Sequence, residues 1–209
     1  MSKIRIRSDE ELEQRKKIFF EIVSILENFK LFYFLQGGVL LGARREKNFI
    51  KWDWDIEISV FAKDLIEKFD IICSELKKNN FFLKNYNSTF FCPKISFDKQ
   101  GHSATSFSII GWKYSYLRRA YTRKKLKIPI KYMNKMDQID FFQKTFFCPG
   151  PIDSYLEYSY NNWKKPIRSE EKEIYLSKKF YTKNFDIFDF FNTVISYFKN
   201  LIQNNSKGK

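Results

Sequence analysis

The pattern of apolar and polar positions predicts that the chain begins with a helix. Apolar side chains recur every three to four residues between Leu12 and Leu26, which is the spacing of one buried helix face. Ser8 and Glu11 stand three residues apart just ahead of this series and fit a capping box. We therefore predict a helix over residues 9–28.

The rest of the chain alternates short strands with short helices. Period-two alternation or a short apolar run predicts a strand, whereas a three-to-four-residue period predicts a helix. The predicted strands are residues 31–36, 53–60, 81–84, 89–97 and 104–111. The predicted helices are residues 38–44, 65–76, 137–142, 152–158 and, amphipathic at the C-terminus, about 185–203. Neither an internal repeat nor a long linker divides this order, so we expect one α+β domain over residues 1–209, with helices packed on a mixed sheet.

One predicted strand carries acidic side chains inside an apolar run. In "WDWDIEISV" (52–60), period-two geometry puts Asp53, Asp55 and Glu57 on one face. The other face, which includes Trp52 and Trp54, is expected to be core. Three neighbouring carboxylates repel each other unless solvent or a cation relieves them. A solvated sheet face is the simpler interpretation, but carboxylates at i and i+2 can also hold one or two divalent cations.

A glycine pair precedes the acidic strand. Gly37-Gly38 runs into a predicted helix, so the backbone can approach a phosphate closely and the helix N-terminus favours negative charge. Arg45 and Lys51, between this turn and the strand, could neutralise phosphates. Each feature alone is common, whereas their order is more specific. Together they predict a nucleotide–metal site, with phosphates at the glycines and Mg²⁺ (or Mn²⁺) on the first two aspartates.

Composition narrows the chemistry. The 38 Lys and Arg against 24 Asp and Glu give a net charge of +14, which favours a nucleotide, nucleic acid, anionic glycan or membrane surface as partner. A single histidine and three scattered cysteines argue against a zinc site and indicate free thiols in a reducing cytoplasm. The N-terminus lacks the apolar centre of a signal peptide, so we expect a cytoplasmic protein. The basic stretch 116–127 fits a nucleic-acid surface, a solvated face, or a seat for an anionic donor or a phosphorylated lipid-linked acceptor.

Two segments resemble a known family. "GGVLLGARREKNFIKWDWDIEI" (37–58) is similar to the signature of the LicD family, which includes the fukutin-related proteins. The matching positions are Gly37, Gly38, Leu40, Leu41, Gly42, Ala43, Arg45, Phe49, Ile50, Trp52, Asp53 and Asp55. "CPGPIDSYLEYSYNNWKKP" (148–166) resembles a later element of the family at Tyr155, Leu156, Tyr160, Trp163 and Pro166. The resemblance covers about residues 15–166.

The resemblance implies a nucleotidyltransferase fold of the DNA polymerase β type. It implies Mg²⁺-dependent transfer of a phosphate-linked group, such as phosphocholine or a polyol phosphate, from a CDP-linked donor to a hydroxyl of a surface glycan, free or lipid-linked. Asp53 and Asp55 would hold the metal, and Glu57 would be a third ligand or orient the acceptor. Nucleic acid is then not the expected partner. The C-terminal helix would pack on the domain or rest on the inner membrane.

The sequence departs from the family pattern at several positions. Val39, Glu46 and Lys51 stand where the family has Thr or Ser, His and Pro. The family's third aspartate corresponds to Ser108 in "SIIGW" (108–112). In the family this aspartate completes the metal site. Here Asp98 or Glu57 replaces it, the acceptor needs less activation, or catalysis is impaired. Ser108 therefore favours one alternative, a non-catalytic nucleotide-binding relative. The other alternative has the same fold and is a nucleotidyltransferase acting on RNA or protein.

Overall fold

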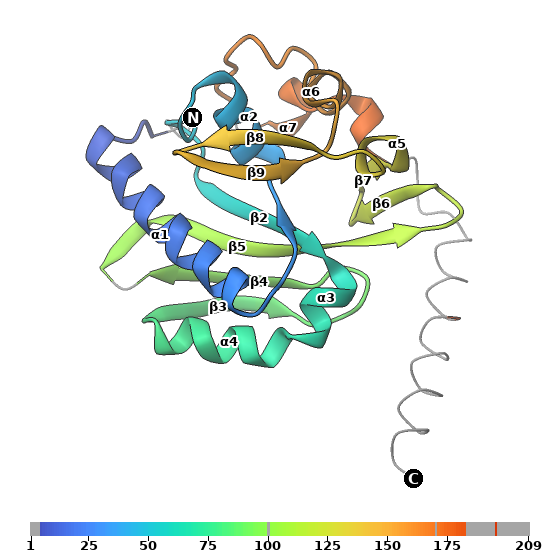
Figure 1. Cartoon of the computed structure of the whole chain (residues 1–209). Coiled ribbons are helices and arrows are strands. Elements are labelled where there is room, and N and C mark those ends of the chain that lie inside the picture. Colours follow the sequence, from blue (N-terminus) through green and yellow to red (C-terminus); the bar gives the residue numbers. More distant parts are fainter. Residues whose placement is uncertain (1–4, 100, 170, 183–194, 196–209) are drawn as a thin grey trace.

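A computed structural model describes residues 5–99, 101–169, 171–182 and 195 (Figure 1). The first helix is confirmed as α1 (Asp9–Asn28). Its capping box is also confirmed, because the Glu11 amide donates to Ser8 Oγ at 3.3 Å and the Ser8 amide donates to Glu11 Oε2 at 3.0 Å.

A mixed sheet of seven strands forms the centre of the molecule. Its strands are β1 (Tyr33–Phe34), β2 (Asp55–Phe61), β3 (Phe81–Asn87), β4 (Lys94–Lys99), β5 (His102–Ser115), β6 (Ala120–Arg123) and β7 (Leu126–Pro129). The order is β1-β2-β5-β4-β3, with β6 paired to β5 and β7 to β6. Only β2 and β5 run parallel among these pairs, and β3, β4 and β5 pair antiparallel, so the predicted mixed sheet is confirmed.

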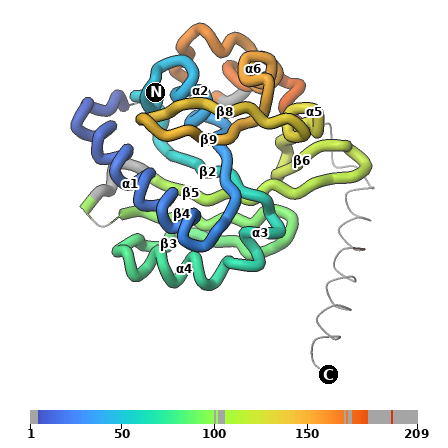
Figure 2. Tube along the Cα trace, viewed as in Figure 1, coloured from blue at the N-terminus to red at the C-terminus, as the bar shows by residue number. Residues whose placement is uncertain are grey.

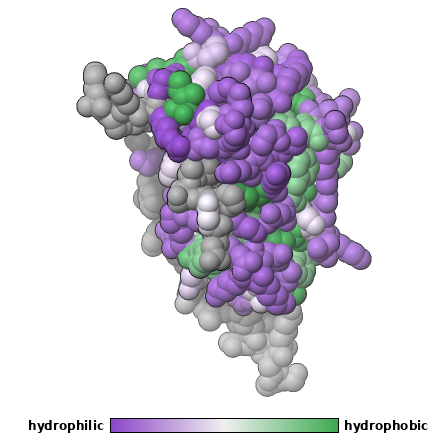
Figure 3. All heavy atoms as spheres, turned by 90° about the vertical axis from the view of Figure 1, so that its left-hand side faces the viewer, coloured by the Kyte–Doolittle hydropathy of each residue, from purple (hydrophilic) through white to green (hydrophobic). Residues whose placement is uncertain are grey.

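Helices α1 and α4 (Phe69–Lys78) pack against each other and cover one face of the sheet (Figure 1). Ile56 and Ile58 of β2 and Phe107 of β5 are buried and belong with Phe19 of α1 to one apolar cluster. Because side chains alternate along a strand, Asp55 and Glu57 then face away from these helices. Hydrophilic residues dominate the surface of the molecule on the α1 side (Figure 3).

The remaining helices are short. They are α2 (Gly37–Arg45), α3 (Ala62–Glu67), α5 (Ile130–Met133), α6 (Ile152–Ser159), α7 (Lys172–Tyr175) and the 3₁₀ turn η1 (Lys178–Phe180). The helices predicted over 38–44 and 152–158 are confirmed, whereas the one predicted over 65–76 is divided at Lys68 into α3 and α4. The helix predicted at about 185–203 lies outside the described residues.

The helix predicted over 137–142 is wrong. This segment is strand β8 (Asp137–Phe141), which pairs with β9 (Lys144–Cys148) in a second small sheet. Phe142 and Gln143 have φ values of +52° and +65° and form the tight turn between the strands. The period of burial is two, with Ile139 and Phe141 inside and Asp140 outside, and that period favours a strand.

The late part of the chain contacts α2, the helix between β1 and β2. Helix α6, orange in Figure 2, lies next to α2. Arg44 of α2 makes a two-pronged ion pair with Asp153 of α6, with nitrogen–oxygen distances of 2.8 and 3.1 Å. Within the described part of the chain, no helix is long and apolar enough to cross a membrane.

Candidate functional site

The turn before α2 and the start of the acidic strand are in direct contact. Gly37 has a φ of +63°, a conformation that side chains disfavour. A Cβ atom on Gly38 would lie only 2.1 Å from Oδ2 of Asp53. The carboxylate of Asp53 therefore occupies the space that any other residue at position 38 would fill.

Strand β2 begins later than the sequence predicts. Asp53 precedes it in a turn, where its amide donates to the Ile50 carbonyl at 3.1 Å. The strand starts at Asp55 and places Glu57 on the same face. Trp54, which we expected in the core, is 66% exposed, because it lies before the regular strand and outside the layer that α1 covers.

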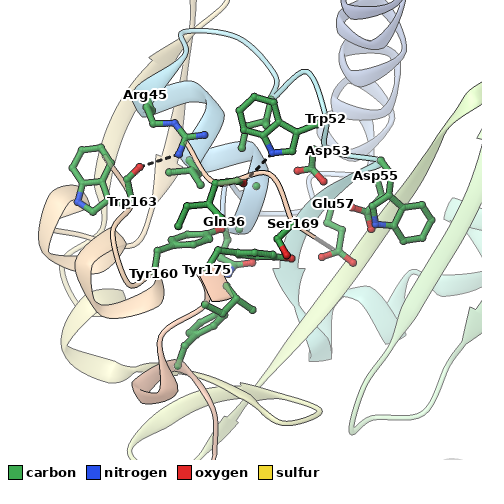
Figure 4. Close-up of a pocket in the computed structure, with 18 of the residues that line it drawn as sticks. Gln36, Arg45, Trp52, Asp53, Asp55, Glu57, Tyr160, Trp163, Ser169 and Tyr175 are labelled. Atoms are coloured by element: carbon green, nitrogen blue, oxygen red, sulfur yellow. Dashed lines mark hydrogen bonds between the residues drawn. The ribbon is translucent and has the colours of Figure 1, made fainter. Parts of the chain in front are cut away.

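These residues line a cavity of about 510 Å³ (Figure 4). Gly37, Gly38, Arg45, Asp53, Asp55 and Glu57 all contribute to its wall, so the structure brings most of the predicted site together. Lys51 does not join them. Its side chain is exposed outside the cavity lining, and its ammonium pairs with Asp9 at 2.7 Å.

The opposite wall is aromatic and comes from the late part of the chain. The rings of Tyr160 and Tyr175 are stacked, with centroids 6.5 Å apart and planes at 23° (Figure 4). Arg45 Nη1 donates to the Trp163 carbonyl at 3.0 Å, and Trp52 Nε1 donates to the Ile167 carbonyl at 3.2 Å. The late segment is thus fastened at Trp163 to the glycine-rich helix and at Ile167 to the residue before Asp53.

Burial shapes the charges around Asp53. Burial raises the pKa of the Asp53 carboxyl to about 6, and the neighbouring Glu57 charge adds to this, while Arg15 and Arg7 oppose it. Burial also lowers the pKa of the Arg15 guanidinium to about 9. The sequence analysis missed these two buried arginines. The signal was present, because Arg15 interrupts the apolar face of α1 three residues after Leu12.

The donor chemistry fits a hard divalent cation. Asp53, Asp55 and Glu57 offer carboxylate oxygens, and the raised pKa of Asp53 shows that negative charge there lacks full compensation. In the described ranges, no three acidic, histidine or cysteine side chains are already gathered as a metal cage. Mg²⁺ is commonly held by one or two carboxylates with water and substrate phosphates, so a full cage is not required.

Ser108, which the resemblance aligns with the family's third aspartate, lies on β5 beside Glu57 of β2. It pairs with Glu57 in the parallel register of β2 and β5, and its hydroxyl is 3.1 Å from that of Ser96. A buried pair of hydroxyls therefore lies beside Glu57. Asp98 does not compensate, because it pairs with Lys84 at 2.7 Å and does not line the cavity.

A nucleotidyltransferase-type α+β domain is the class that this fold and this carboxylate-lined cavity define. Residues 30–151 match the LicD/FKTN/FKRP nucleotidyltransferase domain, and the chain belongs to that family. It is also similar to "Ribitol 5-phosphate transferase FKRP" of Mus musculus and of Homo sapiens, each 39% identical over 44 residues. That stretch is 21% of this chain and 9% of either relative.

One solved structure resembles the fold at a lower level. It is the lincomycin-bound lincosamide antibiotic adenylyltransferase LnuA, with a TM-score of 0.47 and 11% sequence identity. The match covers 74% of this chain and 87% of that chain. Membership of the family therefore rests on the sequence match over residues 30–151.

Proposed function

We propose that the protein transfers a substituted phosphate group from a CDP-linked donor to a hydroxyl of a cell-surface glycan, with a divalent cation. The observation that carries this proposal is the contact of Asp53 with Gly38, which joins the carboxylates to the N-terminus of α2 inside one cavity. A helix N-terminus attracts phosphate, and carboxylates attract the cation that accompanies it.

In this proposal, each wall of the cavity binds a different part of the donor or the cation. The first turn of α2 and Arg45 would bind the donor phosphates, and the stacked pair Tyr160–Tyr175 would offer a flat surface to the base. Asp53 and Asp55 would hold Mg²⁺ or Mn²⁺, which when bound stabilises charge on the donor phosphates.

The reaction itself is a displacement at phosphorus. The acceptor oxygen forms a bond to the phosphorus of the transferred group, the bond from that phosphorus to the bridging oxygen breaks, and CMP leaves. Glu57, two residues after Asp55 on β2, would orient the acceptor hydroxyl and accept its proton. Its neighbour Lys94, 3.5 Å away, would keep the carboxylate in place.

The FKRP relatives suggest ribitol 5-phosphate as one candidate for the transferred group, beside glycerol phosphate and phosphocholine. The short match to those relatives leaves the group open, because substrate contacts usually come from variable loops. The acceptor is proposed to be a glycan built in the cytoplasm, free or lipid-linked.

A second candidate is a non-catalytic nucleotide-binding relative. Ser108 favours it, because the position beside Glu57 carries a hydroxyl bonded to Ser96 where the family has a carboxylate. Binding would then persist while transfer is lost. Transfer of a whole nucleotide to RNA or protein is a third outcome that the same experiment can detect.

Thermal shift and CMP release separate these functions. Each of CDP, CTP and ATP is added with and without Mg²⁺, since a ligand of the folded state raises its melting temperature. CDP-ribitol, CDP-glycerol and CDP-choline are then tested for CMP release with glycan acceptors. We expect a Mg²⁺-dependent preference for cytidine nucleotides and release of CMP that Asp55→Asn abolishes.

Lys51→Ala supplies the matched control. It removes a charge near the site but outside the cavity, so its activity should match that of the wild type. Binding without CMP release would favour the non-catalytic relative, and pyrophosphate release from ATP or CTP would favour nucleotidyl transfer. If no nucleotide shifts the melting temperature with Mg²⁺ present, the proposed donor class is wrong.

A further inference from the structure

A row of aromatic rings lies outside the set of residues that line the cavity. From Phe147 it passes through Phe32, Phe61, Tyr121 and Tyr114 to Tyr116, and successive ring centroids lie 5.4, 5.5, 5.2, 5.3 and 4.8 Å apart. We call these six rings, with Leu117, the aromatic row. Its members come from β9, the β1 region, β2, β6 and β5, so folding gathers them from separate parts of the chain.

The end of the aromatic row is more exposed than packing requires. Tyr116 is 86% exposed and Leu117 is 61% exposed, both in the turn between β5 and β6. Phe32 and Phe147 at the other end are 37% and 41% exposed. Ring contacts across paired strands stabilise a sheet, which accounts for Tyr114 and Tyr121 but not for the two residues at the tip of the turn. Contiguous exposed apolar side chains mark an interaction surface.

The chain segment that carries the tip of the aromatic row is basic. Residues 99–136 contain ten Lys or Arg and no Asp or Glu. Among them, Arg119 lies in the same turn as Leu117, and Lys124 and Lys125 form the next turn; all three residues are exposed. Asp64 of α3, which acts electrostatically on Tyr121, opposes them only in part.

We propose that this surface docks onto an anionic phospholipid bilayer. Tyr and Leu side chains at the tip would enter the headgroup region, where amphipathic rings are favoured, while the exposed cations would attract acidic lipids. A nucleic acid fits less well. Leu117 cannot stack on a base, and the rings of Tyr114 and Tyr116 meet edge to face at 80° and so do not present parallel open faces. The docking surface does not depend on the catalytic assignment.

Vesicle sedimentation with the full chain tests the inference. Vesicles of phosphatidylcholine alone are compared with vesicles that also hold about 30% phosphatidylglycerol, at rising salt. We expect binding to the anionic vesicles only, weakening with salt. The double change Tyr116→Ser with Leu117→Ser should weaken it roughly tenfold or more, through lost apolar insertion. The triple change of Arg119, Lys124 and Lys125 to Gln should weaken it by about fivefold per charge.

Matched controls isolate the surface. Ile71→Ser with Phe82→Ser removes two other exposed apolar side chains, on α4 and β3. Lys17, Lys47 and Lys77 changed to Gln remove the same net charge from exposed positions elsewhere. Both controls should bind vesicles as the wild type does. The proposal is overturned if neither set of row variants weakens binding, or if controls weaken it equally. It is also overturned if the row variants instead abolish binding of a single-stranded oligonucleotide or dimer formation, with vesicle binding absent.

Discussion

A methyl group at position 38 would test the placement of Asp53. The Cβ of Gly38→Ala would lie 2.1 Å from Asp53 Oδ2, whereas real Cβ contacts essentially never fall below 3.0 Å, so the carboxylate must retreat by about 0.9 Å. Misplacement of a reacting group by about 1 Å can cost roughly 10²-fold in rate. We therefore expect a loss of this order in transfer and a clear loss of Mn²⁺ affinity.

Stability should hardly change in this variant. The atom that must move is the end of a side chain, and Ala is favoured over Gly within a helix by up to about 1 kcal/mol. Gly37→Ala is the matched control. No atom lies within 4 Å of its Cβ, but a φ of +63° makes it cost about 1–2 kcal/mol of unfolding free energy. The two variants should thus show opposite patterns of stability and function.

Urea unfolding and calorimetric titration with Mn²⁺ measure the two effects separately. The reasoning requires Gly38→Ala to keep its folded stability and to lose cation binding. If it binds Mn²⁺ as the wild type does and transfers at the same rate, the contact between position 38 and Asp53 does not position the carboxylate. A strongly destabilised Gly38→Ala would show that the Asp53 side chain cannot retreat.

Three further outcomes follow from the site. Asp53→Asn should abolish transfer but raise unfolding free energy by up to roughly 3 kcal/mol in metal-free buffer at pH 7, because burial raises the pKa of this carboxyl from 3.8 to about 6. The charged form of the Asp53 carboxyl is disfavoured in the folded state, so the unfolding free energy of the wild type should fall as pH rises from 3.8 to about 6. If Asp53→Asn shows the same fall, Asp53 is not the group responsible. Arg45→Ala should raise the donor KM about tenfold with little change in kcat, since a phosphate clamp acts equally in ground and transition states; an unchanged KM with a large drop in kcat contradicts this. Ser108→Asp buries a charge beside Glu57 and should destabilise the metal-free protein. Mn²⁺ should then raise the melting temperature of this variant more than that of the wild type. Asp98→Asn removes only the ion pair with Lys84 and should leave Mn²⁺ binding unchanged.

Local sequence patterns were enough to predict that the carboxylates of residues 53–57 cluster and that a helix follows the glycine pair. The alternation of Asp55 and Glu57 fixes their common face on β2, whereas Asp53 reaches the cavity from the turn before the strand. Gly37-Gly38 marks where a helix can begin. Lys51 lies in the turn between α2 and β2, where no helical or strand periodicity indicates which way its side chain points. Its ammonium is held by Asp9, which is 42 residues earlier in the chain. Such a pairing depends on tertiary structure and cannot be read from spacing.

The position of Trp54 was also predicted wrongly, and two features of the site were not predicted. Trp54 fits the apolar alternation of a strand, yet the strand starts one residue later and the ring stays outside the core. The aromatic wall of the cavity was not predicted. Tyr160 and Trp163 were noted only as positions that match the family element, and Tyr175 belongs to a segment with little periodicity. Arg15 could have been predicted, since a charge on the buried face of a helix needs a partner, and Asp53 is the acid that acts on it most.

The fastening of the late segment onto the early motif has a consequence for biosynthesis. Trp52 and Ile167, joined by a hydrogen bond, are 115 positions apart in the chain. At roughly 5–20 residues per second, about 6–23 s pass on the ribosome between the emergence of the two residues. During that interval the acidic turn has no aromatic wall, so a nascent chain lacks the enclosed cavity that a donor would enter. A translational pause after residue 60 would lengthen this open period, whereas a premature stop before residue 160 would leave the carboxylates in open solvent.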